Sequence, residues 1–208
     1  MKHLLENWRG FLNENLMLKP GPNGWDLYIK IVAEAYMNAP EFEQRAVSSF
    51  KANVPFIEKM FKRIQSKVKI EFVDFHPYKT AEELRQDVKS TGIMKIATAD
   101  AEHEIYSPEV NAKFRAIHDY MAHIQAIGSR GTEFTPRGEI AAYNVHLKTL
   151  PKAAVPALFT EVIGQVSVYS VTGKFAEQKI CLLDGFDYYN LGVVEGYDIV
   201  NKELVKKS

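Results

Sequence analysis

The stretch FRAIHDYMAHIQAIG, residues 114–128, places two histidines and an aspartate in one amphipathic helical pattern. Imidazole nitrogens and carboxylate oxygens are the ligands that zinc and other first-row divalent ions use in proteins. On a straight α-helix Asp119 and His123 share a face, whereas His118 and His123 point about 140° apart. The spacing predicts that both histidines bind one ion only if the helix bends or a side chain reaches far.

Polar side chains also lie on apolar faces of the next two helical patterns. In the first of these patterns, Glu139 and His146 lie within about 20° of each other, with Tyr143 between them. In the second, Glu161 is followed one turn later by Gln165 in a segment with almost no other polarity. An ionised carboxylate there is costly unless a cation or donors compensate it. The two patterns therefore extend the candidate site.

Helix boundaries suggest how these residues meet. Ser107 and Thr135, each followed by proline, are typical N-cap residues, and the sequence predicts helices over 108–127, 136–150 and 156–172. Because loops of a few residues join them, we expect these helices to be neighbours. The residues expected to converge are His118, Asp119, His123, Glu139, His146 and Glu161.

Simpler explanations exist for single members of this set. Glu139 could be present only because a carboxylate is favourable in the first turn of a helix. Glu161 could pair with an arginine, for which Arg115, Arg130 and Arg137 are candidates. Gly164 is most simply explained by a close helix crossing, and Gln165 by a hydrogen bond in the core. Several unusual placements on adjacent helices nevertheless favour a common site.

The rest of the chain predicts a mainly α fold. Residues 1–66 carry three core-facing helical patterns, and 174–208 carry a helix, an aromatic loop and a last amphipathic helix. Residues 67–106 contain two strand-like runs around a short helix that a Thr80 and Glu83 capping box opens.

We therefore expect one compact multi-helix domain over 1–208 with a small two-stranded β element near residues 68–98. The candidate site lies on the three-helix segment 107–173.

Composition argues against several kinds of function. The chain has 26 basic and 26 acidic residues, so no net charge draws it to nucleic acid or to an anionic membrane. The first residues lack the apolar core of a signal peptide, and no later run approaches the roughly 18 apolar residues of a membrane span. We expect a soluble cytoplasmic protein that binds neither nucleic acid nor membranes. Its expected partner is a small molecule or a peptide.

The single cysteine limits the kinds of metal site. Cys181 excludes an internal disulfide and any Cys-rich zinc site, and its apolar surroundings ICLL are typical of a buried, inert thiol. A metal ion would therefore be held by histidines and carboxylates.

The three helices together resemble a set of uncharacterised phage and bacterial proteins. The likeness rests on an H-D-x-x-x-H helix, a G-E…H helix and an E-x-x-G-Q helix, followed by EQK, and covers roughly residues 75 to 180. The resemblance implies no established activity. The positions it singles out are His118, Asp119, His123, Glu139, His146, Glu161 and Gln165.

The first functional hypothesis is a metal-dependent hydrolase. Zinc, or else manganese or iron, would be held by His118, His123, Glu139 and His146 and would activate a water molecule. Glu161 or Asp119 would accept the proton of this water as general base. Gln165 and Tyr143 would support the site.

Two alternatives remain open at this point. The same residues could form a satisfied hydrogen-bond network in a non-catalytic phage structural or host-interaction protein, with no open cavity beside His118. The adjacent His118 and Asp119 are also similar to the core of HD-type metal phosphohydrolases. That arrangement would need an upstream histidine, His76 or His103, and a downstream aspartate, Asp184. Peptidases of the H-E-x-x-H type fit less well, because no glutamate follows His118.

Overall fold

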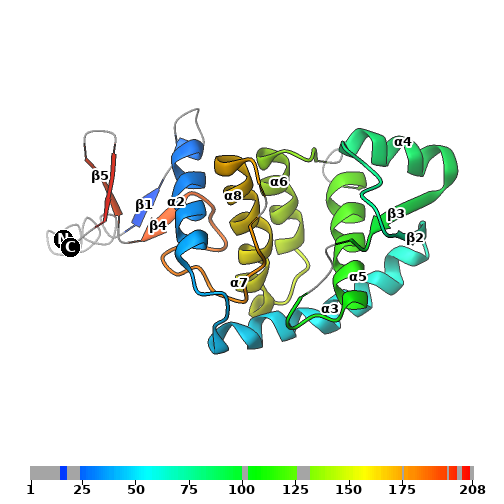
Figure 1. Ribbon diagram of the computed structural model, residues 1–208, viewed down its shortest axis with the longest axis horizontal. Coiled ribbons are helices and arrows are strands. Elements are labelled where there is room, and N and C mark those ends of the chain that lie inside the picture. Colours follow the sequence, from blue (N-terminus) through cyan, green and yellow to red (C-terminus); the bar gives the residue numbers. More distant parts are fainter. Residues whose placement is uncertain are drawn as a thin grey trace, which may run out of the picture.

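A long helix, α3 (Val47–Gln65), runs beneath the other helices of the molecule (Figure 1). A short 3₁₀ turn, η1 (Gln44–Ala46), leads into it, and α5 (Pro108–His118) and α7 (Val155–Leu158) pack on it. The computed structural model describes residues 15–17, 24–99, 103–125, 132–174, 176–195, 197–200 and 203–206. These residues are mainly helical, which confirms the predicted fold class.

The helices above α3 stand side by side (Figure 1). They are α2 (Gly24–Asn38), a continuous helical rod over residues 152–172, α6 (Pro136–Leu147) and α5. The rod consists of η3 (Lys152–Ala154), α7, the π-helix η4 (Phe159–Gly164) and α8 (Gln165–Thr172). The three helices expected to carry the site are therefore neighbours. Ser107 and Thr135 cap α5 and α6 as predicted, because each hydroxyl accepts a backbone N–H.

The predicted β element is a parallel βαβ unit at one end of the molecule (Figure 1). Strands β2 (Lys69–Val73) and β3 (Ile93–Ala97) pair in parallel over their full length, with Lys69 opposite Ile93 and Val73 opposite Ala97. The helix α4 (Ala81–Thr91) connects them. The Thr80 hydroxyl caps α4 by accepting from the Glu83 N–H, as predicted. Because α4 packs on η2 (Asp119–Ile124), the segment that follows α5, the unit supports the part of the chain that carries His123.

The helices predicted for the C-terminal segment are wrong. In the described part of 174–206 the chain forms β4 (Val193–Glu195), which pairs antiparallel with β1 (Asn15–Met17), and a hairpin of β5 (Tyr197–Val200) and β6 (Glu203–Lys206). Residues 176–192 run without helix. The β-branched residues Val193, Val194, Ile199 and Val200 suit a strand once a partner is present, and tertiary pairing overrides the helical pattern. The helix predicted near the N-terminus lies outside the described residues, apart from Asn15 in β1.

Most of the rod over 152–172 is buried, in keeping with the low polarity of the helix predicted over 156–172. Among the described residues, this is the one helix that is long enough and apolar enough to cross a membrane. Its most apolar 18-residue window has a mean hydropathy of 1.3, and 61% of that window is buried inside the fold. The sequence predicted that no run approaches a membrane span in length and hydropathy; by these two measures alone, this helix does. Cys181 packs nearby as a fully buried thiol, and burial raises its pKa to about 11.

Gly164 allows α2 and the rod to approach closely, as the sequence suggested. A Cβ atom there would lie 2.5 Å from Cδ2 of Tyr36, whose hydroxyl donates to the Glu177 carbonyl oxygen. We expect Gly164→Ala to lower the free energy of unfolding by about 1–3 kcal/mol, because the fixed ring cannot move aside. Urea unfolding measures this effect. Ser170→Ala on the exposed side of α8 is the control and should change stability by less than about 0.5 kcal/mol.

Candidate metal centre

A π-helix brings the two histidines of the first motif together. The helix α5 continues into η2 (Asp119–Ile124), which ends with a hydrogen bond from the Gln125 N–H to the Tyr120 carbonyl oxygen, five residues back. Wider turns of this kind bring residues five apart onto one face. The rings of His118 and His123 consequently lie 4.8 Å apart between centroids. The separation of 140° applies to a straight α-helix, and the π-helix supplies the departure from it that the sequence required for both histidines to meet.

The potential ligand atoms of His118, His123 and Glu139 have the separations expected for atoms that bind one ion. The Nε2 atoms of His118 and His123 are 3.0 Å apart. The carboxylate of Glu139 lies 3.0 Å from the first of these nitrogens and 3.5 Å from the second. Tetrahedral zinc with bonds near 2.0–2.1 Å places neighbouring ligand atoms about 3.3 Å apart. The observed separations match this spacing.

Asp119 adds a second carboxylate to the cluster. One ligand atom from each of His118, Asp119 and His123 lies within 4.8 Å of the others, so this cluster could hold a metal ion. With Glu139, the set contains two imidazoles and two carboxylates.

Hydrogen bonds on the outer ring nitrogens orient both imidazoles. Nδ1 of His123 lies 2.9 Å from the backbone oxygen of Thr132, to which it donates, and 3.0 Å from the Thr132 hydroxyl. Nδ1 of His118 lies 3.3 Å from Nε2 of His146. In metal sites such outer contacts select the tautomer that leaves the inner nitrogen free for the ion. His146, expected as a ligand, is thus placed behind His118, with its ring stacked on it.

The position of Glu139 depends on the start of α6. Its neighbour Gly138 packs against the preceding segment, where an added Cβ atom would lie 1.8 Å from the Glu133 backbone oxygen. The Gly138 N–H also donates to the Thr135 hydroxyl that caps the helix. Because no side chain separates the two segments, the first turn of α6 lies next to the segment that carries Thr132.

Charges within the cluster stabilise one another. Burial lowers the pKa of His118, but the charge and the hydrogen bond of Glu139 outweigh burial and raise it. Burial raises the pKa of Glu139, and the charge of His118 and its hydrogen bond outweigh this and lower it. Burial, with the nearby charge of His118, lowers the pKa of His123 to about 4. Without metal, these opposite shifts favour the charged forms of His118 and Glu139, and a divalent ion bound there would displace the proton of His118.

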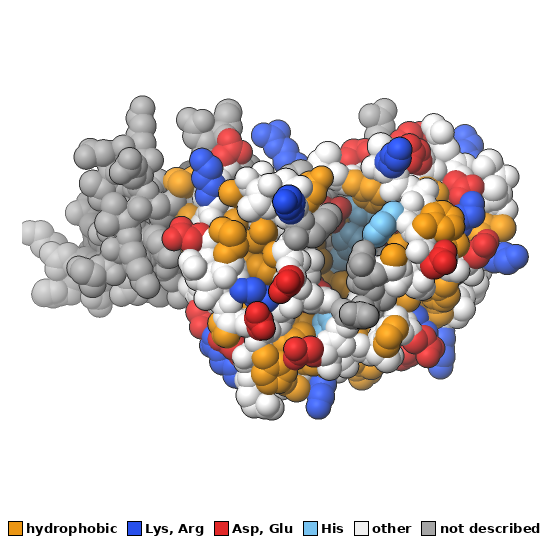
Figure 2. Space-filling view, viewed as in Figure 1, with side chains coloured by type: hydrophobic (Ala, Val, Ile, Leu, Met, Phe, Trp, Pro, Cys, Tyr) orange, Lys and Arg blue, Asp and Glu red, His pale blue; other side chains and the backbone are white. Residues whose placement is uncertain are grey.

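The cluster opens into a cleft of about 940 Å³. His118, Asp119 and Glu139 line it, together with the aromatic rings of Phe114, Phe134 and Tyr169. Figure 2 shows a hollow on this face with histidine side chains inside it. The side chains of His118 and Glu139 are 16% and 15% exposed, so a small molecule in the cleft can reach the cluster.

Glu161 lies in the same cleft but contacts other residues. Its Oε2 accepts a hydrogen bond from the Gln178 amide at 2.6 Å, and its Oε1 faces Nε2 of His103 at 4.0 Å. Among the described residues, neither the Glu161 Oε1 atom nor the His103 Nε2 atom has a hydrogen-bond partner. Burial raises the pKa of Glu161 to about 8, which favours the protonated form of this carboxyl at pH 7. Gln165 lines the cleft beside it.

Other predicted residues lie away from the cluster. Tyr143 is fully buried, and its hydroxyl donates to the Tyr188 backbone oxygen. Asp184, the aspartate that an HD-type site would need, accepts from Arg45 on an exposed part of the surface. His76 lines the cleft, whereas His103 lies against Glu161. The structure thus does not bring the full HD-type set together.

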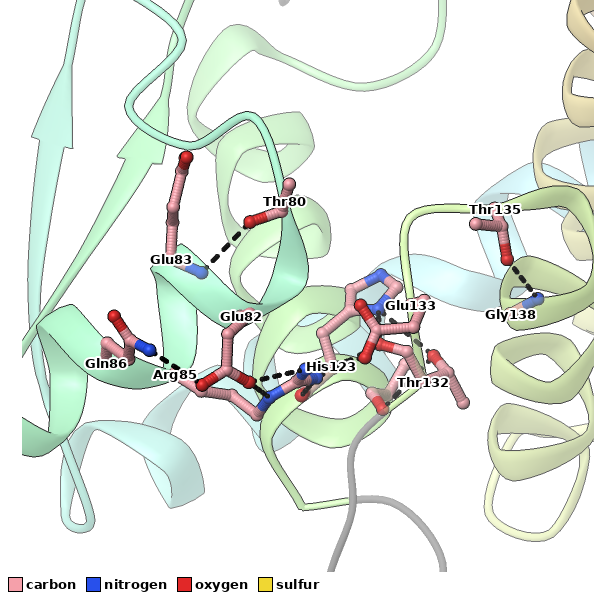
Figure 3. Close-up of polar contacts among 11 residues, drawn as sticks. Thr80, Glu82, Glu83, Arg85, Gln86, His123, Thr132, Glu133, Thr135 and Gly138 are labelled. Atoms are coloured by element: carbon pink, nitrogen blue, oxygen red, sulfur yellow. Dashed lines mark hydrogen bonds and ion pairs between the residues drawn. The ribbon is translucent and has the colours of Figure 1, made fainter.

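Sequence reasoning missed two residues that hold the site, Arg85 and Thr132. Figure 3 shows Arg85 reaching from α4 to the backbone of His123 and to the segment with Thr132. Neither residue stands out in the sequence, because Arg85 contacts backbone oxygens of other segments and Thr132 acts through its own backbone oxygen.

Comparisons of the chain with protein-family models, with curated proteins and with solved structures find no match.

Proposed function

We propose that the protein is a metal-dependent hydrolase whose divalent ion is held by His118, His123 and Glu139. The observation that carries this proposal is the spacing of 3.0 to 3.5 Å between the two Nε2 atoms and the Glu139 oxygens. Two imidazoles and carboxylate oxygens suit zinc first, with manganese and iron as alternatives.

The surroundings of the cluster favour catalysis over a purely structural ion. Structural zinc sites are closed by four protein ligands, whereas catalytic sites keep a position open to water. Here the cluster borders a cleft of about 940 Å³. A bound ion would lower the pKa of a water molecule in that position. Asp119, which shares the cluster, is the carboxylate suited to accept the proton, because burial favours the protonated form of Glu161 at pH 7.

A non-catalytic protein is the second candidate, and one observation favours it. His118, His123 and His146 are hydrogen-bonded to protein groups without any ion, as a structural network would require. A structural network, however, predicts no cavity beside His118, and the cleft lies there. We therefore place this alternative second.

Metal analysis of protein purified without a His tag tests the proposal. We expect close to one zinc, manganese or iron ion per chain, and slow hydrolysis of p-nitrophenyl acetate or bis-p-nitrophenyl phosphate that a chelator stops and the metal restores. Protein that holds no metal and is not stabilised by Zn²⁺, Mn²⁺ or Fe²⁺ would contradict the proposal. Bound metal without hydrolysis of either compound would favour the structural alternative.

A further inference from the structure

The ring of His123 is fixed from outside the cluster by the backbone of another segment. The imidazole is buried, with 1% of its side chain exposed, and its Nδ1 donates to the Thr132 carbonyl oxygen. Thr132 is tied to η2 in turn, since its N–H donates to the Ala122 carbonyl oxygen at 2.9 Å. The direction of the His123 Nε2 atom therefore depends on where the Thr132 segment lies.

Arg85 is the side chain that joins these two segments. Its Nη1 donates to the His123 carbonyl oxygen at 3.2 Å and lies 3.5 Å from the Thr132 carbonyl oxygen. Its Nη2 contacts the Glu133 carboxylate at 2.6 Å. One guanidinium group thus bridges the π-helix and the segment that orients its histidine (Figure 3).

The guanidinium itself is held in place by its own helix. Both Nε and Nη2 of Arg85 contact the Glu82 carboxylate, at 3.1 and 3.0 Å. With these two nitrogens occupied, Nη1 is directed at the carbonyl oxygens of His123 and Thr132. A rigid planar fork can serve all these acceptors at once, whereas the single ammonium group of a lysine cannot.

We propose that Arg85 is a positioning residue of the metal centre, which sets the tautomer and direction of the His123 ring through Thr132. The role of this ring as a ligand rests on the proposed function, but its orientation does not. Loss of an outer partner of a metal ligand typically lowers metal affinity 10- to 100-fold.

Two measurements on Arg85→Ala and Arg85→Lys test this role. We expect the zinc affinity, measured by competition with a chelator, to fall 10- to 100-fold in both variants. In the metal-free protein, long-range ¹H–¹⁵N spectra of the imidazole rings should show His123 protonated at Nδ1 in the wild type and a mixture of tautomers in the variants. Arg85→Lys keeps the positive charge and most of the aliphatic part of the side chain, so we expect this variant to fold even if Arg85→Ala does not.

Arg63→Ala, at an exposed arginine near the end of α3, is the matched control and should change neither measurement. Wild-type-like affinity and an unchanged His123 tautomer in the Arg85 variants would overturn the positioning role while leaving the metal site standing. A wild type that binds neither zinc nor manganese nor iron would instead refute the proposed function. The tautomer measurement would then still decide whether Arg85 orients the ring.

Discussion

Replacing His118 with alanine is expected to lower zinc affinity by more than about a hundredfold, because loss of a direct ligand costs more than loss of an outer partner. The Nε2 atom of His118 is the one that contacts both His123 and Glu139. A ligand present at a thousand times its Kd stabilises the native state by about 4 kcal/mol. Chelator competition measures the affinity. Thermal unfolding with and without Zn²⁺ should show that Zn²⁺ stabilises the wild type but not His118→Ala.

His76→Ala provides the control for this loss. His76 lines the same cleft, is exposed and lies outside the cluster. We expect its zinc affinity to stay within about twofold of the wild type. Equal affinities for His118→Ala and the wild type would mean that any bound ion sits elsewhere.

The wild type is expected to lose stability between about pH 6.5 and 8, and Glu161→Gln is expected to remove the part of this loss that Glu161 causes. Burial raises the pKa of Glu161 from 4.5 to about 8 in the folded protein. A carboxyl whose pKa is raised by folding contributes stability that is fully present below pH 4.5 and is lost as the pH rises toward 8. The loss amounts to about 1.4 kcal/mol per pH unit, or about 2 kcal/mol over this window.

The histidines explain why the window begins near pH 6.5. Burial lowers the pKa of His103 and His123 to about 4 and that of His146 to about 3, so they reduce stability only as the pH falls below 6.5. His118 has a raised pKa and, like Glu161, loses its contribution as the pH rises. The difference between the wild type and Glu161→Gln therefore isolates the effect of Glu161.

Urea unfolding of both proteins at pH 6.5 and pH 8 measures this difference. Because the glutamine keeps an oxygen that can accept from Gln178, the variant should fold normally and gain about 2 kcal/mol relative to the wild type at the higher pH. Glu104→Gln, at an exposed carboxylate, should follow the wild type. Parallel pH profiles for the wild type and Glu161→Gln would show that Glu161 is already ionised in the native protein.

Local patterns in the sequence determined much of the helical framework. Ser107 and Thr135 marked the starts of α5 and α6 because an N-cap hydroxyl satisfies a backbone N–H within its own turn. Gly164 indicated a close helix crossing, and it meets Tyr36. Such features depend on neighbours along the chain, or on the absence of a side chain, and can be recognised without the fold.

The meeting of His118 with His123 was decided only by the tertiary structure. Regular α-helical geometry separates the two rings, and a π-helix, braced by Arg85 and the Thr132 segment, brings them together. The C-terminal strands follow the same rule, because β4 needs β1 from the far end of the chain. In both cases the deciding hydrogen bonds end on backbone groups of another segment of the chain, and every residue carries those groups regardless of its type.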